Sequence, residues 1–287
     1  MTGPQPAVAR MLPDGRRLHL HHGPIDLIIE AFGPGAGQAL SIAELRFATV
    51  LEELVCELDQ LRKPCRKNHK FRGAIAQRMQ KGTEYFLPEF ITPMACVAGS
   101  VADEVLAAMT VVDDIDKIYV NNGGDTAIYL SPGTSMKAAI AAPGKAEITI
   151  RASDDARGIA TSGWRGRSYS LGIADSVSVV ASTCARADAA ATMIANAVNL
   201  PDHNNVERAI ARDLSPDTDL GNILVTTEVG ELSKIEITSA LDKGAKLAQS
   251  CINEKAIKGA ILFLKNQNRQ IGEVNLIHNH SGEPAIA

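Results

Sequence analysis

The sequence predicts an α+β fold in which antiparallel sheets pack against helices. Short β-rich runs bounded by Gly, Pro and Asp dominate the middle of the chain, and long helical patterns interrupt these runs instead of alternating with single strands. The 287 residues are 45% hydrophobic and 22% charged, so the chain is long and apolar enough to bury a sizeable core. We expect a single domain over residues 1–287, with a flexible tail over 279–287.

Strands are expected wherever a β-rich run is bounded by turn-forming residues. The first two runs flank Gly23-Pro24 and predict an opening hairpin. The later runs have the spacing of an antiparallel meander. The expected strands cover 16–22, 25–32, 117–121, 127–130, 137–141, 147–151, a run at Ile159, 176–181, 223–227, 234–238, 260–264 and 273–277.

Helices are expected where apolar residues recur every three or four positions. From Ser41 to Leu61 this spacing is continuous, and Ser41 followed by Glu44 has the form of an N-terminal capping box, so one long amphipathic helix is expected. The polar, Pro-containing stretch after it is expected to be irregular. The remaining segments are an irregular stretch over 63–93 and helices over 100–109, 185–198 and 239 to about 257.

Charge and cysteine content exclude several classes of protein. With 29 basic and 33 acidic side chains and no long basic block, the chain is not expected to bind nucleic acid, which requires clustered cations. No apolar run approaches the roughly 20 residues of a membrane helix. The first ten residues lack the pattern of a signal peptide, so a cytoplasmic location is expected. The five cysteines are odd in number and widely spaced, which favours reduced thiols.

The strongest local pattern for chemistry is Ala-Asp-Ala-Ala-Ala-Thr over 187–192. On a helix, Asp188 and Thr192 project from the same face one turn apart. A carboxylate and a hydroxyl form an oxygen pair suited to Mg²⁺ or Ca²⁺, and the alanines leave room for a ligand. The same letters also fit an Asp that complements the helix dipole and a Thr bonded to a carbonyl, and spacing alone favours that structural interpretation.

Two further clusters follow expected strands. The first, over 122–125, contains paired glycines, whose bare backbone N–H groups suit a phosphate or a ring oxygen, although a plain hairpin turn predicts the same letters. The second, over 161–163, is a turn or an anion contact. The residues of the two clusters are Asn122, Gly123, Gly124 and Asp125, then Thr161, Ser162 and Gly163.

In this order, Asn-x-Gly-Gly-Asp after a strand, Thr-Ser-Gly and Ala-Asp-Ala-x-x-Thr on a helix resemble the ApbE superfamily. Its founding members are magnesium-dependent FAD:protein FMN transferases. The resemblance runs from about Met94 to Leu200. Outside that region, the segments over 23–27, 170–177 and 217–221 are similar to signatures of an ApbE-like branch of bacterial and archaeal proteins.

The resemblance implies two related T-fold-type halves, over about 15–110 plus C-terminal elements and about 111–240. It also implies that Asp188 and Thr192 hold Mg²⁺. The residues that it implies for the flavin nucleotide site are Gly99, Asp103, Asn122, Gly123, Gly124, Asp125, Thr161, Ser162 and Gly163.

The chain departs from the transferase pattern at two places. Ala98 stands where the transferases carry a lysine, which removes a cation that would meet a phosphate. The segment from Tyr169 to Asp175 is shorter than the corresponding His-x-x-Asp-Pro segment and has neither histidine nor proline. Both departures weaken the expectation of FAD binding and phosphoryl transfer more than that of the fold.

Three functions are therefore weighed. The first is an ApbE-like protein that binds FAD, FMN or a similar heterocyclic ligand and acts as a Mg²⁺-dependent flavin transferase or hydrolase. The second is a pterin- or other heterocycle-binding enzyme of coenzyme metabolism that has lost FMN transfer. The third is a non-catalytic oligomeric binding protein; edge strands favour a homo-oligomer in every case. No general base stands out among the candidates Asp103, Asp125, Tyr169 and His69.

Overall fold

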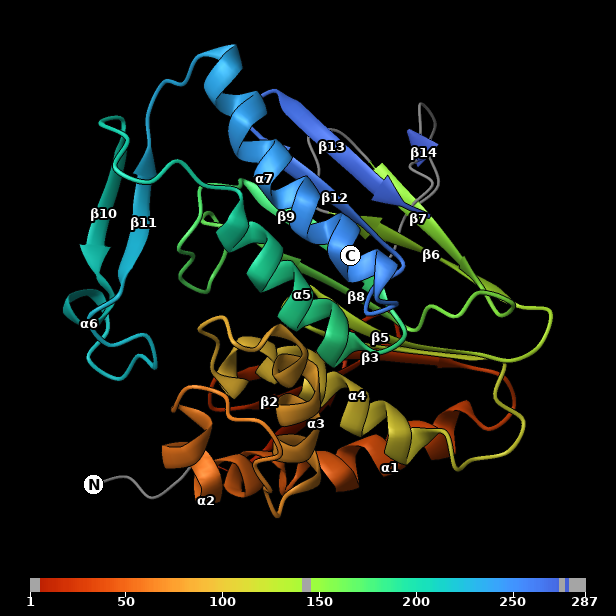
Figure 1. Ribbon diagram of the computed structural model, residues 1–287. Helices are drawn as coiled ribbons and strands as arrows, with labels where there is room; N and C mark the ends of the chain where they lie inside the picture. Colours follow the sequence, from red (N-terminus) through yellow and green to blue (C-terminus); the bar gives the residue numbers. More distant parts are fainter. Residues whose placement is uncertain (1–5, 141–145, 274–276, 279–287) are drawn as a thin grey trace.

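The computed structural model describes residues 6–140, 146–273 and 277–278. Within these residues the largest element is an antiparallel sheet of nine strands, in the spatial order β1-β2-β3-β4-β5-β8-β9-β12-β13 (Figure 1). Its strands are β1 (Val8–Met11), β2 (Leu18–His22), β3 (Ile25–Phe32), β4 (Lys117–Asn122), β5 (Asp125–Leu130), β8 (Gly158–Ser162), β9 (Ser176–Ala181), β12 (Gly259–Leu264) and β13 (Gln267–Gly272).

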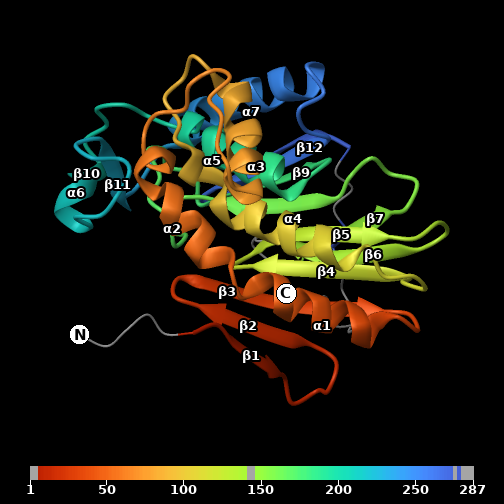
Figure 2. The same ribbon diagram turned by 90° about the horizontal axis from the view of Figure 1, so that it is seen from below.

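Helices cover one face of this sheet (Figures 1 and 2). The α-helices of this layer are α1 (Ala36–Phe47), α2 (Val50–Leu61), α3 (Ala74–Thr83), α4 (Val97–Met109), α5 (Cys184–Ala197) and α7 (Lys234–Asn253). Two short 3₁₀ helices, η1 (Glu84–Phe86) and η2 (Pro93–Cys96), lie between α3 and α4 in the chain. The other face packs against a small sheet of order β14-β7-β6, formed by β6 (Ser135–Ile140), β7 (Ala146–Arg151) and β14 (Ile277–His278).

Alternation along the strands divides the apolar side chains between two cores. In β4, Ile118 and Val120 are buried against the helices, whereas Tyr119 points to the opposite face and is buried there with Ile128 and Met136. A sheet that is covered on both sides must be apolar on both sides. This is why the central strands are almost continuously hydrophobic.

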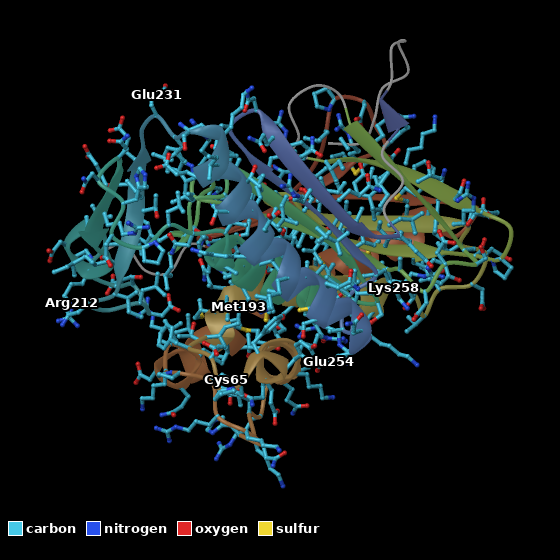
Figure 3. The ribbon with its side chains drawn as sticks, turned by 45° about the horizontal axis from the view of Figure 1, so that its top comes forward. Cys65, Met193, Arg212, Glu231, Glu254 and Lys258 are labelled. Carbon is cyan, nitrogen blue, oxygen red and sulfur yellow. The ribbon has the colours of Figure 1, made fainter. Side chains whose placement is uncertain are left out.

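An arm projects from the body beside the sheet (Figure 1). It consists of β10 (Val206–Ile210), α6 (Ala211–Leu214) and β11 (Leu224–Val229). Figure 3 shows Arg212, in α6, at one end of the arm and Glu231, just after β11, beyond the other end. The arm is held to the body by a few hydrogen bonds, among them Thr226 N to Ser170 O at 2.8 Å and Lys265 Nζ to Val229 O at 2.7 Å.

The predicted α+β class with antiparallel sheets and packed helices is confirmed. Apart from β1 at one edge, two similar runs make up the large sheet. In sequence, the hairpins β2–β3 and β4–β5 enclose α1 to α4, and the hairpins β8–β9 and β12–β13 enclose α5 and α7. This is the repeated arrangement expected of two related halves. The residue boundaries expected for the halves, and the single domain over 1–287, stay predictions. The tail over 279–287 lies outside the described residues.

The long helix predicted from Ser41 to Leu61 is wrong. The segment holds two helices, α1 and α2, separated at Thr49, and α1 begins before Ser41, whose hydroxyl donates to the carbonyl of Gly37 instead of capping a helix. The break is held by side chains, because Arg46 donates to Thr49 and to Glu53 across it. Apolar spacing runs through the break, so periodicity alone cannot detect it.

Three other expectations are wrong in part. The stretch over 63–93, predicted to be irregular, contains α3, and the strand predicted over 234–238 is the first turn of α7. There a capping box between Ser233 and Glu236 starts a helix in spite of the β-rich letters. The last strand of the large sheet is β13, over Gln267–Gly272, whereas the predicted strand covered 273–277. Residues 274–276 of that prediction lie outside the described residues.

The helices α4 and α5 meet at unusually short range near their N-terminal ends. A Cβ on Gly99 would lie 2.5 Å from the carbonyl oxygen of Cys184, so only glycine fits there. Each helix also caps the other. Asp103 of α4 accepts from the N–H groups of Cys184 and Ala185 at 3.0 and 2.9 Å, and Asp188 of α5 accepts from the N–H of Gly99 at 2.9 Å.

We predict that Gly99→Ala lowers the free energy of unfolding by about 1–3 kcal/mol or more, because the new methyl group forces the two helices apart. The measurement is urea unfolding followed by circular dichroism. Gly37→Ala in α1 is the matched control, since its Cβ would meet nothing within 4 Å. This control should change stability by at most about 1 kcal/mol, on the stabilising side. Equal stability of the two variants would contradict the close contact.

Candidate functional site

A cavity of about 1100 Å³ lies at the turn between β4 and β5. The apolar part of its wall comes from Leu51, Leu54 and Leu58 of α2, together with Met94 of η2. Met193 of α5, labelled in Figure 3, also lines it. A largely apolar wall with a few polar groups is typical of sites for small organic ligands.

The β4–β5 turn presents its backbone to the cavity. Gly123 and Gly124 have φ angles of +64° and +113°, which are favourable for glycine and form the tight hairpin turn. The turn is fixed to the helices because Asn122 donates from Nδ2 to the carbonyl of Ala98 at 3.1 Å. The position at which the transferase pattern has a lysine is therefore next to the turn and in the cavity wall.

Two buried carboxyl groups face each other beside this turn. Asp125 follows it directly and is 8% exposed, and Asp188 is 9% exposed. Each has one backbone donor: the N–H of Thr161 bonds to Asp125 at 3.1 Å, and the N–H of Gly99 bonds to Asp188.

Burial of this pair changes its proton affinity. Burial raises the pKa of Asp125 to about 7. Burial, together with the neighbouring Asp125 carboxylate, raises the pKa of Asp188 well above its usual range. Two neighbouring carboxyl groups that are both shielded from water cannot both be ionised unless a cation binds between them. At neutral pH the pair therefore holds a proton or binds a cation.

The residues fit a hard divalent cation. Thr192 lies one helical turn after Asp188 and lines the same cavity, and its hydroxyl donates to the carbonyl of Ala95 at 3.3 Å. Carboxylate, hydroxyl and carbonyl oxygens are the ligands that Mg²⁺ accepts, and it usually retains several waters. In the part of the chain that the structure describes, no group of three or more His, Cys, Asp and Glu side chains is arranged to hold a metal. A cation here would rely on two carboxylates and neutral oxygens.

The Thr-Ser-Gly segment forms another part of the wall. The Thr161 hydroxyl hydrogen-bonds to the Ser178 hydroxyl at 2.7 Å on the neighbouring strand. A Cβ on Gly163 would lie 2.5 Å from the carbonyl oxygen of Asp175, so this glycine serves chain packing. Ser162 lines the cavity as well.

The structure brings most of the predicted site residues together. The residues that line the cavity are Asn122, Gly123, Gly124, Asp125, Thr161, Ser162, Gly163, Asp188 and Thr192. Gly99 and Asp103 are not among the lining residues and take part in the contact between α4 and α5. Their assignment to the flavin site stays a prediction. Of the candidate general bases, Asp125 and Tyr169 line the cavity, and Asp103 and His69 do not.

Sequence patterns missed several lining residues. Arg62 and Arg167 contribute cations to the wall. The arm supplies Thr218, Asp219 and Leu220, and the Thr92 hydroxyl donates to the Asp219 carboxylate across the cavity rim. The only signal for the arm was the segment 217–221, which resembles a signature of the ApbE-like branch.

Comparison with known proteins identifies the family of the chain. A family model described as AbpE bacteria matches residues 9–276. A UPF0280 protein of Methanopyrus kandleri is 30% identical over 159 residues, or 54% of this chain and 61% of its own length. A UPF0280 protein of Methanothermobacter thermautotrophicus is 36% identical over 133 residues, 42% of this chain and 49% of its own. The aligned region thus spans about half to three fifths of these relatives.

Two solved structures are similar in fold. The flavin transferase ApbE of Vibrio cholerae, in a mutant form, aligns over 92% of this chain and 96% of its own, with 13% identity and a TM-score of 0.50. The flavinyl transferase ApbE of Pseudomonas stutzeri, in the apo form, aligns over 92% and 94%, with 12% identity and a TM-score of 0.47. Among the described residues, no helix is long and apolar enough to cross a membrane. The chain belongs to the family described as AbpE bacteria and has an ApbE-like fold.

Proposed function

We propose that the protein binds a flavin nucleotide, FAD or FMN, in the cavity and acts on it with Mg²⁺ as a transferase or hydrolase. The observation that carries the proposal is the buried pair Asp125 and Asp188, with Thr192 beside it, in a large cavity with an apolar wall. A planar ring system fits the apolar wall, and a phosphate that bridges to a cation fits the acidic end. Membership of a family with an ApbE-like fold supports the same class of ligand.

The groups of residues that line the cavity have different roles in this function. Asp188 and Thr192 would hold Mg²⁺ together with Asp125 or a backbone oxygen, and the ion would neutralise the charge that develops on the phosphoryl oxygens. The α2 leucines exclude water from the ring, and the β4–β5 turn positions the phosphate end. When Asp125 does not bind the cation, its raised pKa lets it hold a proton beside Asp188 instead.

One observation favours a second candidate. Ala98 lies in the cavity wall and has only a methyl group where the transferase pattern carries a lysine, and the segment 169–175 brings a tyrosine and no histidine to the wall. A site with less positive charge at this point suits a planar ligand without a diphosphate, such as a pterin. We therefore keep a pterin- or other heterocycle-binding enzyme as the alternative.

We predict that the purified protein converts FAD and water to FMN and AMP when Mg²⁺ is present, and that Asp188→Ala reduces the rate at least about a hundredfold because the cation is lost. The products are separated by liquid chromatography, with and without an added acceptor protein. Asp113→Asn, an exposed carboxylate outside the cavity, is the control. If FAD is left intact and a reduced pterin binds tightly, the result contradicts the flavin function and supports the pterin-binding alternative. If neither ligand binds, a non-catalytic protein remains.

The acidic pair also predicts how stability depends on pH. In the folded protein the pKa of Asp125 is about 7, whereas its usual value is 3.8. The stabilisation that comes from this higher proton affinity is therefore fully present below about pH 4 and is lost as pH rises to about 7. Without metal, the free energy of unfolding should therefore fall between pH 5 and pH 8. Between these two pH values the contribution of Asp125 is at most about 3 kcal/mol, because about two pH units separate pH 5 from its pKa of about 7.

Urea unfolding at both pH values, in EDTA and in Mg²⁺, measures this effect. Mg²⁺ should restore stability at pH 8 and change little at pH 5, because protons and the cation compete for the same oxygens. Asp188→Asn should remove the Mg²⁺ effect, whereas Asp113→Asn should leave both the pH dependence and the Mg²⁺ effect unchanged. A stability that does not depend on Mg²⁺ at pH 8 would argue against a cation on this pair.

A further inference from the structure

The cavity contains basic side chains whose roles differ. The basic residues in its wall are Arg62, Lys137, Arg165 and Arg167. Arg165 is already engaged, because its Nε donates to Asp175 at 2.7 Å and its guanidinium lies 4.5 Å from the ring centre of Trp164. Arg62 is the C-cap residue of α2, where a cation is favourable for the helix itself. Both therefore have a structural reason to be where they are.

Arg167, by contrast, neither forms an ion pair nor stands at the end of a helix within the described parts of the chain. It also forms no side-chain hydrogen bond there. Its Nη1 atom lies 3.3 Å from the position that a Cβ of Gly123 would occupy, so the guanidinium rests on the bare backbone of the β4–β5 turn. A larger residue at 123 would push it away.

The loop that carries Arg167 is fixed by its other residues. Trp164 N donates to the carbonyl of Ala174 at 3.0 Å, and Gly166 N donates to the carbonyl of Gly163 at 3.0 Å. With the Arg165–Asp175 ion pair, these bonds hold the loop without any contribution from Arg167. The side chain is therefore presented to the cavity by a supported loop and is left with its donors available.

The charges of the cavity specify the kind of group that it would meet. A guanidinium offers several N–H donors in one plane, which match two oxygens of a phosphate. The guanidinium of Arg167 lies at the same turn as Asp125, whose side chain hydrogen-bonds to that of Asp188. A phosphate placed here would have Arg167 on one side and the cation of the acidic pair on the other.

We propose that Arg167 binds the phosphate of the ligand over the Gly123–Gly124 turn, and that this contact makes the cavity select phosphate-bearing forms of a heterocycle over the phosphate-free form. The inference rests on the proposed function, since it concerns the same cavity. It adds a residue that determines specificity and that no motif in the sequence indicated.

The test compares FAD, FMN and riboflavin, which share a ring system and differ in phosphate. Each is titrated by calorimetry into the wild type, Arg167→Gln, Arg167→Lys and the control Arg10→Gln, which alters an exposed arginine on β1 outside the cavity. In Arg167→Gln we expect the affinity for FAD and FMN to fall about tenfold or more, since a hydrogen-bonded charge is lost. Riboflavin affinity should change less than about twofold in the same variant, because no charged contact is removed.

Two further results support the inference: partial recovery of FMN affinity in Arg167→Lys, and no change in Arg10→Gln. Unchanged FAD and FMN affinity in Arg167→Gln, or an equal loss for riboflavin, overturns it while the proposed function stands. If the wild type binds none of the three flavins, the proposed function fails. Titration with inorganic pyrophosphate then decides the role of Arg167, because equal binding by the wild type and Arg167→Gln overturns it and weaker binding by the variant supports it.

Discussion

The reciprocal capping of α4 and α5 is the contact on which the rest of the structure depends. Asp103 accepts from the first N–H groups of α5, and Asp188 accepts from the N–H of Gly99 in α4. Both carboxylates are thereby held in an apolar environment by donors that would otherwise lack partners. The same contact directs Asp188 towards Asp125, so the candidate site is produced by the way in which the two helices cross.

Sequence patterns predicted the sheet well and the helices less well, for a physical reason. A strand is defined by alternation and by the turn residues at its ends, and both are visible in a few letters, as at Gly23-Pro24. A break within a helix, such as that at Thr49, leaves the apolar spacing intact. At 234–238 a local capping box outweighs β-rich composition, and composition alone does not reveal which of the two prevails.

The site was predictable only where its residues are close in the sequence. The segments 122–125, 161–163 and 188–192 each carry a pattern, and all three line the cavity. Arg167 carries none, and for Asp219 the only signal is the resemblance of 217–221 to a branch signature. The contacts of Asp219 come from far along the chain, since Thr92 is 127 positions away from it. Gly99 illustrates the opposite difficulty. It matches a motif of the transferases, yet its observed contact is with the backbone of Cys184.

The arm formed by β10, α6 and β11 has a thermodynamic consequence. An isolated two-stranded unit is at best marginally stable, so the arm keeps its position only through its attachments to the body, including that between Thr92 and Asp219. Its loop with Thr218 and Leu220 forms part of the cavity wall. Docking of the arm and occupancy of the cavity are therefore linked equilibria. Any molecule that touches this loop stabilises the docked arm by the same free energy by which docking strengthens its binding.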